Sequence, residues 1–488
     1  MTDGAVLARR LARLRAERDE GAAAIRATIG GLIPLTPTAG PPDARRADSG
    51  LGERLALAVG GELVRGCRGN YVRCEPPSIP LPLDRARLAR LPGPPDTAPP
   101  LVCLDVETTG LGTASGTLAF LVGLGWWESG RFRQLGLLLP DQSEEPALLE
   151  AVAGVLPPGA WLVTYNGRAF DWPLLTGRFR LARSPVPRPA GHLDLLPLAR
   201  RLFRHRLPDA RLGTVERELL DLRRGRDVEG WQIPGLYLDF LRGGPAAPLL
   251  DVLRHNEEDV RSLARLLQLL ARDYADPAGR AAAPAGDLAG LGRAYRDAGR
   301  LEEALACLEE ALAASGRTQA WEAPWGSAPL PWGARPWDRP LAFPAGGREA
   351  LRTERAHLLR RLGRADAALA AWIEVANDGG AGAPAAWIEV AKAHEHRGRD
   401  PRAALEAVEQ ARTALGRARL TGRRLPRLED DLLRREARLR RSIARRWTAP
   451  GVPRPGMGPP ADRPAVPARR PPSGGRAPRA RVAQLAPA

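Results

Sequence analysis

Three apolar segments follow one another between residues 101 and 140, and only short polar breaks separate them. They read LVCLDVE, TLAFLVGLGWWE and RFRQLGLLLP. Runs of this length, rich in apolar and aromatic residues, predict buried strands. A helix is expected at about 144–155, then a strand, AWLVTYN, and further helices, the last of which runs to about residue 274. This order of elements predicts an α/β domain at 99–275, with a mixed sheet flanked by helices.

The remainder of the 488 residues divides by composition, as a chain of this length is expected to contain two or three domains. Residues 1–98 are expected to be an irregular N-terminal region and linker, in which 60–74 alternate like a short hairpin. Residues 286–447 are expected to form an all-α helical repeat domain. Residues 448–488, rich in Arg, Pro and Ala, predict a disordered tail.

The repeat prediction rests on helix-turn-helix spacing with a glycine at each turn. Gly363 and Gly398 are 35 residues apart, close to the 34-residue period of tetratricopeptide repeats, whereas Gly299 and Gly363 are 64 apart. The longer interval contains a Trp/Pro-rich insert at 317–347, which predicts a loop. A generic helical bundle is the alternative. A repeat stack would offer a surface for a protein partner.

Charge and cysteine content narrow the class of protein further. The formal net charge of +17 favours polyanionic partners, nucleic acid first. Lys392 is the only lysine and the predicted tail is Arg-rich, so part of this excess reflects composition. The four cysteines lack zinc-knuckle spacing, which argues against a zinc site. Neither a secretory signal nor a long apolar run is visible, so no membrane association and a cytoplasmic location are expected.

The chemistry is predicted by acidic residues that follow strands. Asp105 and Glu107 end the first apolar segment two residues apart, so in a strand both project to one face. Asp171, in YNGRAFDWPLL, stands at the start of a predicted helix. His255 and Asp259, in HNEEDV, are four residues apart and share a helical face. Four carboxylates without a Cys or His cluster favour hard cations, Mg²⁺ or Mn²⁺.

The order Asp-x-Glu, then Asn-x-x-x-Phe-Asp, then His-x-x-x-Asp resembles the DEDD superfamily of 3′→5′ exonucleases, which have the ribonuclease H-like fold. The resemblance covers about residues 100–275. It implies a nuclease that hydrolyses phosphodiesters with two metal ions. The stretches at 192–216 and 228–241 also resemble a YprB-like bacterial family. That family joins such a domain to tetratricopeptide repeats.

The resemblance also implies a role for each motif residue. Asp105 would bridge two divalent cations, Glu107 and Asp259 would complete one of them, and Asp171 would reach the second. His255 would orient or deprotonate the attacking water. The residues implied in substrate binding are Thr108, Asn166 and Phe170, although Asn166 and Phe170 have an alternative interpretation, in which they cap a helix and fill the core.

One spacing departs from the superfamily. A His occupies the position four before the last Asp, where the tyrosine branch has a Tyr, whereas the histidine branch has its His five before. The role of His255 as general base is therefore left open. His192 and Asp194 are interpreted as a capping arrangement before a helix, and Glu257 and Glu258 as a solvated face.

Two functions of different class follow. The first is a metal-dependent 3′→5′ exonuclease on single-stranded DNA or RNA. The second is a non-catalytic scaffold that binds nucleic acid and recruits a partner through its repeats, because a fold does not guarantee activity. A structure-selective endonuclease that uses the same metals is a third possibility.

Overall fold

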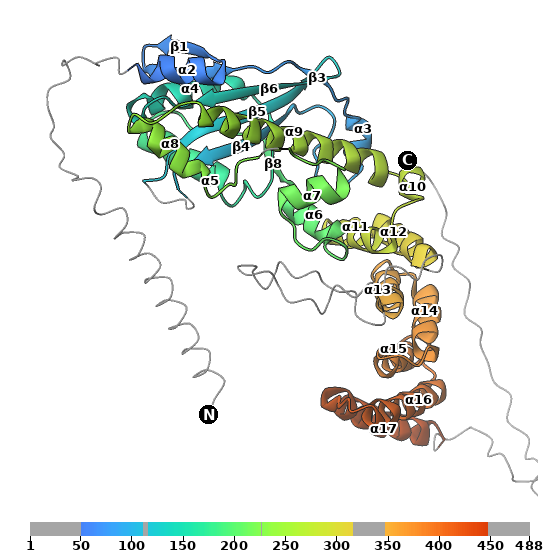
Figure 1. The fold of residues 1–488 in the computed structure, drawn as a ribbon. Helices are drawn as coiled ribbons and strands as arrows, with labels where there is room; N and C mark the ends of the chain where they lie inside the picture. The colour runs from blue at the N-terminus through green and yellow to red at the C-terminus, as the bar shows by residue number, and fades with distance from the viewer. Residues whose placement is uncertain (1–49, 111–115, 226, 316–346, 448–488) are drawn as a thin grey trace, which may run out of the picture.

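A computed structural model describes residues 50–110, 116–225, 227–315 and 347–447. A sheet with helices packed on it forms one end of the molecule, and from α11 onward a column of helices leads away from it (Figure 1). Among the described helices, none is both long enough and apolar enough to cross a membrane.

The sheet has eight strands within the described residues, in the order β1-β2-β6-β5-β4-β7-β8, with β3 paired to β6. Strands β4, β7 and β8 are parallel, and the other pairs are antiparallel. The predicted mixed sheet is confirmed. Its strands are β1 Glu62–Gly66, β2 Gly69–Cys74, β3 Ile79–Pro80, β4 Leu101–Thr108, β5 Ala119–Glu128, β6 Arg131–Leu138, β7 Trp161–Thr164 and β8 Gly191–Asp194.

The structure differs from the expected irregular region at 1–98. Its described part begins with α2 (Leu51–Val59), continues into the β1–β2 hairpin and includes the short α3 (Arg85–Leu88). Strand β2 pairs with β6, with Val72 opposite Leu138. The physical reason is burial: Val72 has no exposed surface and extends the core that β6 begins. The domain boundaries themselves stay predictions, and the predicted insert (to residue 346) and tail lie outside the described residues.

Helices cover both faces of the sheet. One core contains α2, α4, α5, α8 and the first turns of α9, and the other contains α6, α7 and the rest of α9. The predicted helix at 144–155 is confirmed as α4. The helices of this part are η1 Gln142–Glu144, α4 Glu145–Val155, α5 Asp171–Leu181, α6 Leu195–Phe203, α7 Leu212–Leu219, α8 Ile233–Leu241, α9 Pro248–Tyr274 and α10 Pro277–Arg280.

Helix α9 approaches the sheet closely because glycines line the strands beneath it. A Cβ on Gly123 of β5 would lie 2.9 Å from a methyl of Val260, and one on Gly136 of β6 would lie 2.7 Å from a methyl of Leu253. Such distances leave no room for a side chain. The glycines therefore set how near α9 lies to β4, the strand that carries Asp105.

Within the described residues, the C-terminal region is all helical, as predicted. Three antiparallel helix pairs follow one another, and α17 packs on the last pair. Gly299 and Gly363 take left-handed conformations (φ 79° and 74°) at the first two turns, whereas at the third turn this conformation belongs to Arg399. The assignment to tetratricopeptide repeats stays a prediction. The helices are α11 Ala285–Asp297, α12 Leu301–Ser315, α13 Gly347–Arg361, α14 Ala365–Asn377, α15 Ala383–His396, α16 Pro401–Leu420 and α17 Pro426–Trp447.

The helical region shares a continuous core with the sheet. Asp287 of α11 is fully buried and accepts hydrogen bonds from Arg206, at 2.9 and 3.0 Å, and from the Tyr274 hydroxyl, at 2.5 Å. His205 Nε2 lies 3.3 Å away. This buried polar cluster joins α11 to the end of α6 and to the last residue of α9.

Candidate active site

Strand β4 presents Asp105 and Glu107 on the face that α9 covers. Both alternate with Val106, which is buried in the opposite core, so the two acids share a side with Cys103. The register with β5 shifts between Glu107 and Thr108, where the strand ends. Thr108, predicted to bind substrate, donates its hydroxyl to the carbonyl oxygen of Gly110 at 2.6 Å.

A tight turn after β7 brings Asp171 to the same place. Asn166 has a left-handed backbone (φ 69°), and its N–H donates to Asp194 Oδ1 at 2.7 Å. A Cβ on Gly167 would lie 2.5 Å from Thr164 Cβ and 2.7 Å from Asp171 Oδ2, so only glycine fits there. Helix α5 then begins at Asp171 itself. The predicted substrate-binding Phe170 is 44% exposed beside it.

Helix α9 supplies the third part of the site. His255 Nε2 lies 3.8 Å from Glu107 Oε1 and 3.7 Å from Asp259 Oδ2. Between them in the sequence, the fully buried Asn256 donates a hydrogen bond of 2.8 Å to Asp105 Oδ2. The structure thus brings together all five residues predicted as catalytic, from β4, α5 and α9. Asn256 was not predicted.

The carboxylates perturb one another. Burial raises the pKa of Asp105 well above its usual range, and the charges of Asp259, Glu107 and Asp171 raise it further. The hydrogen bond from Asn256 acts in the opposite direction. Carboxylates that are held together in a buried place repel, and a bound cation or proton relieves the repulsion.

The same causes act on the neighbours of Asp105. Burial, opposed in part by His255 and assisted by Asp259, raises the pKa of Glu107 to about 7. Burial and then the charge of Asp194 raise the pKa of Asp171 to about 7. Burial by itself lowers the pKa of His255, but Asp259 and the hydrogen bond to Asp227 reverse the direction, so that its pKa is raised.

A resident cation, Arg224, lies at the edge of the cluster, in the segment between α7 and α8. Its guanidinium pairs with Asp259 and with Glu216, whose Oε2 accepts from Arg224 Nε at 2.8 Å. It also lies 3.2 Å from Asp227 Oδ2. Asp227 Oδ1 in turn is 2.7 Å from His255 Nδ1, so His255 faces Glu107 and Asp259 with Nε2. None of Arg224, Glu216 and Asp227 was predicted.

The donor set suits hard divalent cations. The four acidic side chains offer only oxygen ligands. Their pKa values are raised, which means that the positive charge around them is too small to stabilise all four carboxylates in their ionised form. Within the part of the chain that the structure describes, however, no three His, Cys, Asp or Glu side chains are arranged to share one ion. Asp259 is held by Arg224 instead, and an ion that used Asp259 would displace the guanidinium.

The remaining predictions in this region have separate outcomes. The capping interpretation of Asp194 is confirmed, since it accepts from Leu196 N at 3.1 Å at the start of α6. Asp194 also accepts from the backbone of Asn166 and so holds the turn that leads to Asp171. The expected solvated face at Glu257 and Glu258 is partly buried, because Arg261 lies against both acids. All four cysteines are free, so no disulfide links them.

Residues 102–271 match the profile of a family described as the RNase_H superfamily. With the mixed sheet and its flanking helices, this part of the chain is an RNase H-like domain. Over 168 residues, which are 34% of the chain, the sequence is 42% identical to the uncharacterized protein YprB of Bacillus subtilis (strain 168). The match spans 40% of that relative's length. The resemblance to the YprB-like family is confirmed over the domain alone.

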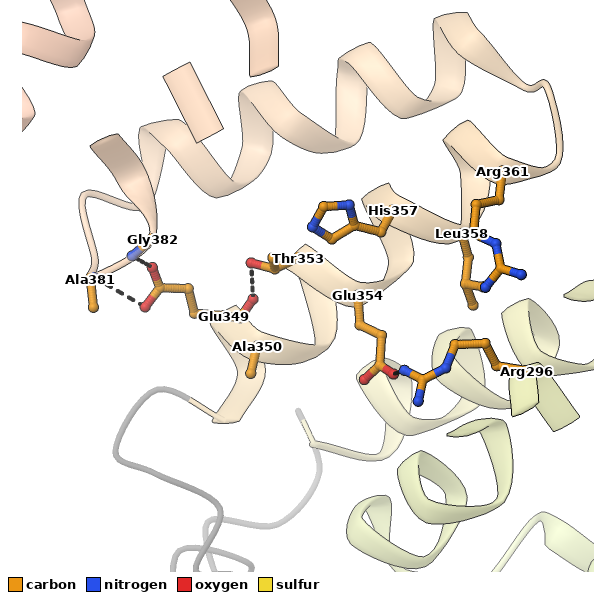
Figure 2. Close-up of a pocket in the computed structure, with 10 residues that line it drawn as sticks. All are labelled: Arg296, Glu349, Ala350, Thr353, Glu354, His357, Leu358, Arg361, Ala381 and Gly382. Carbon is orange, nitrogen blue, oxygen red and sulfur yellow. Dashed lines mark hydrogen bonds and ion pairs between the residues drawn. The ribbon is translucent and has the colours of Figure 1, made fainter. Parts of the chain in front are cut away.

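Two cavities bear on function. One of about 760 Å³ adjoins the carboxylates and is lined by His255, Asp259, Arg224 and parts of α7. The other, of about 660 Å³, lies in the helical region between α11, α13 and the turn before α15 (Figure 2). There, Glu349 accepts from the backbone N–H of Ala381 at 3.1 Å and from that of Gly382. Of the five residues predicted as catalytic, His255 and Asp259 line the first cavity.

Proposed function

We propose that the chain is a metal-dependent nuclease, and more narrowly a 3′→5′ exonuclease that acts on single-stranded nucleic acid in the cytoplasm. The observation that carries the proposal is the convergence of Asp105, Glu107, Asp171 and Asp259 within an RNase H-like domain. A buried group of four acids has no evident stabilising role, because burial raises the pKa of all four and the charges of its neighbours raise the pKa of Asp105 further.

The acids would act together as ligands. Asp105, fixed by Asn256, would contact two Mg²⁺ or Mn²⁺ ions, with Glu107 and Asp259 on one and Asp171 on the other. When bound, these ions would supply charge stabilisation for an attacking water and for the leaving 3′ oxygen.

His255 would hold the attacking water. Its Nδ1 is 2.7 Å from Asp227, which leaves Nε2 turned toward Glu107 and Asp259. Nε2 would orient the water and accept its proton. Thr108, Asn166 and Phe170 border the carboxylates and would contact the terminal nucleotides.

The test is degradation of 5′-labelled single-stranded DNA and RNA with Mn²⁺ or Mg²⁺. A ladder of shortening products that needs the metal and is lost in Asp105→Asn is the expected result, since the variant keeps the size of the side chain. Asp251→Asn, on the exposed first turn of α9, is the control and should leave the ladder intact. A single discrete cut would replace the exonuclease with an endonuclease that uses the same site.

The alternative function is a scaffold that binds nucleic acid without cleavage and recruits a protein through the helical region. The cavity of Figure 2 is the observation in its favour, because it is larger than a packing defect and lies between helix pairs. No cleavage of either polymer, together with equal binding by the wild type and Asp105→Asn, would establish this alternative over the nuclease.

A further inference from the structure

A second groove with a different charge lies at the far end of the helical region. It has a volume of about 540 Å³ and is formed by the turn between α15 and α16 and by the C-terminal half of α17. Figure 1 shows these helices at the end of the molecule opposite the sheet. Four arginines line the groove, Arg399, Arg438, Arg441 and Arg445, and its one carboxylate is Glu395.

Two arginine side chains already balance the charge of Glu395. Glu395 accepts from Arg438 at 2.7 and 2.9 Å and from Arg435, whose side chain is 7% exposed. By contrast, Arg399 and Arg441 are exposed, and neither forms an ion pair with any residue that the structure describes. The lining of the groove therefore contains more guanidinium groups than carboxylates. In the cavity of Figure 2, Glu349 and Glu354 are both held by donors, Glu354 by Arg293 and Arg296.

The excess extends along α17 beyond the groove. Arg427, Arg434 and Arg441 are exposed and recur every seven residues, which places them on one face of the helix, about 10 Å apart. Within the described residues, neither Arg427 nor Arg434 has an ion-pair partner. A length of about 10 Å spans roughly three phosphates along one strand of a duplex. The seven-residue spacing keeps the three arginines on one side of α17, with the exposed Asp430 between the first two, and a repeated spacing of positive charge suits a regular polyanion.

The chemistry of these side chains selects phosphate. Each guanidinium offers a planar fork of donors that fits two phosphate oxygens, and it stays charged at any physiological pH. Of the residues that line the groove, only Pro401 and Leu439 are apolar, and the others are charged or polar. An acidic protein segment is the less suitable occupant, since protein recognition depends on buried apolar anchors.

We propose that the α15–α17 groove and the arginine row on α17 bind the sugar-phosphate backbone of nucleic acid, as a second contact remote from the carboxylate site. The inference concerns binding alone, so it does not depend on whether the RNase H-like domain cleaves. A strand held at both places would remain on the protein while its end occupies the carboxylate site.

The experiment measures binding of a fluorescein-labelled single-stranded oligonucleotide by anisotropy, with the full chain in EDTA. An Asp105→Asn background removes cleavage. The variant Arg399→Gln/Arg441→Gln removes two groove charges, and Arg360→Gln/Arg364→Gln is the matched control. Both controls are exposed arginines of the same region, paired with Glu389 and Glu302. A salt titration gives the number of phosphate contacts from the slope of log K against log salt.

The groove variant should bind several-fold more weakly at low salt, and its slope should fall by about 1.4, or about 0.7 for each lost contact to a single strand. Arg434→Gln alone should lower the slope by about 0.7. The control pair should match the parent. Equal slopes and affinities in the groove variant and the control would overturn the proposal. Displacement of the oligonucleotide by poly-glutamate at equal charge concentration would also overturn it, in favour of an acidic protein partner.

Discussion

Asn256 Nδ2 lies 2.8 Å from Asp105 Oδ2, in a space that exists because residue 123 is a glycine. Gly123 is the residue of β5 paired with Asp105 in the sheet register. A Cβ at this position would lie 2.0 Å from Asn256 Oδ1. The central carboxylate of the site, its hydrogen-bond donor and the missing side chain are thus one packing arrangement.

Gly123→Ala should destabilise the fold by about 1 to 3 kcal/mol, because the methyl group overpacks the contact between α9 and β5. Urea unfolding measures the change. Gly154→Ala is the matched control, since Gly154 is in α4 with nothing within 4 Å of its ideal Cβ, and it should be neutral or stabilising by up to about 1 kcal/mol. Equal effects of the two substitutions would contradict the proposed packing.

Arg224→Gln should strengthen divalent-ion binding and weaken the ion-free fold. The substitution frees Asp259 and removes a positive charge beside the carboxylates, so Mn²⁺ affinity should rise on the order of tenfold or more in calorimetric titration. Without the ion, Glu216 loses its partner while only 2% exposed, and the melting temperature should fall.

Arg217→Gln is the control for that prediction, because Arg217 pairs with the exposed Glu218 on the same helix as Glu216. It should change neither Mn²⁺ affinity nor the melting temperature by a measurable amount. Weaker Mn²⁺ binding by Arg224→Gln would mean that Arg224 supports the ion site rather than competing with the ion.

Stability in EDTA should fall as pH rises. The folded protein keeps protons on Glu107 and Asp171 up to a pKa of about 7, whereas the unfolded chain releases them near 4.5 and 3.8. The native state therefore binds more protons across this window, so the free energy of unfolding decreases from about pH 4 to 7.

Glu107→Gln should remove its share of that slope and stabilise the metal-free protein at pH 8 by up to roughly 3 kcal/mol. Glu150→Gln, on the exposed face of α4, is the control and should leave the pH profile unchanged. Thermal melts between pH 4 and 8 give the profile. A free energy of unfolding that rises over this range would refute the mutual repulsion of the carboxylates.

Arg206→Met should destabilise the whole chain by about 3 kcal/mol. Methionine keeps the stem of the side chain but leaves the fully buried Asp287 without its guanidinium. Arg201→Met, on α6 five residues before Arg206, breaks an exposed pair with Asp297 and should cost less than about 1 kcal/mol. Similar losses in both variants, measured by urea unfolding, would show that the buried cluster does not join the two regions.

The elements that sequence predicts well are those with a strong local pattern. Strands β4 to β7 and helix α9 follow from apolar runs and helical spacing, and the metal-ligand candidates lie in β4, at the start of α5 and on α9. The pairing of β2 with β6 joins residues more than sixty positions apart, so no local pattern contains it. The hairpin was visible in the sequence, but its place at the sheet was not.

The site is predictable in the same uneven way. Arg224 is one of several arginines in its stretch of the sequence. Only the fold, which places it against the buried Glu216, distinguishes it from the others. Asn256 did leave a signal that was not used: it occupies the position between Leu253 and Val260 where helical spacing demands an apolar residue. A lone amide on an apolar helical face indicates a buried partner, and here the partner is Asp105.

Helix α9 runs without a break for 27 residues, about 40 Å, from the glycine-lined strands to the first helix of the C-terminal region. Asp259 contributes to the carboxylate site near its middle, and Tyr274 bonds to Asp287 at its end. Helix α9 is therefore one continuous element that takes part in both contacts. A change that bends α9 would alter the position of Asp259 relative to Asp105 as well as the contact of Tyr274 with Asp287.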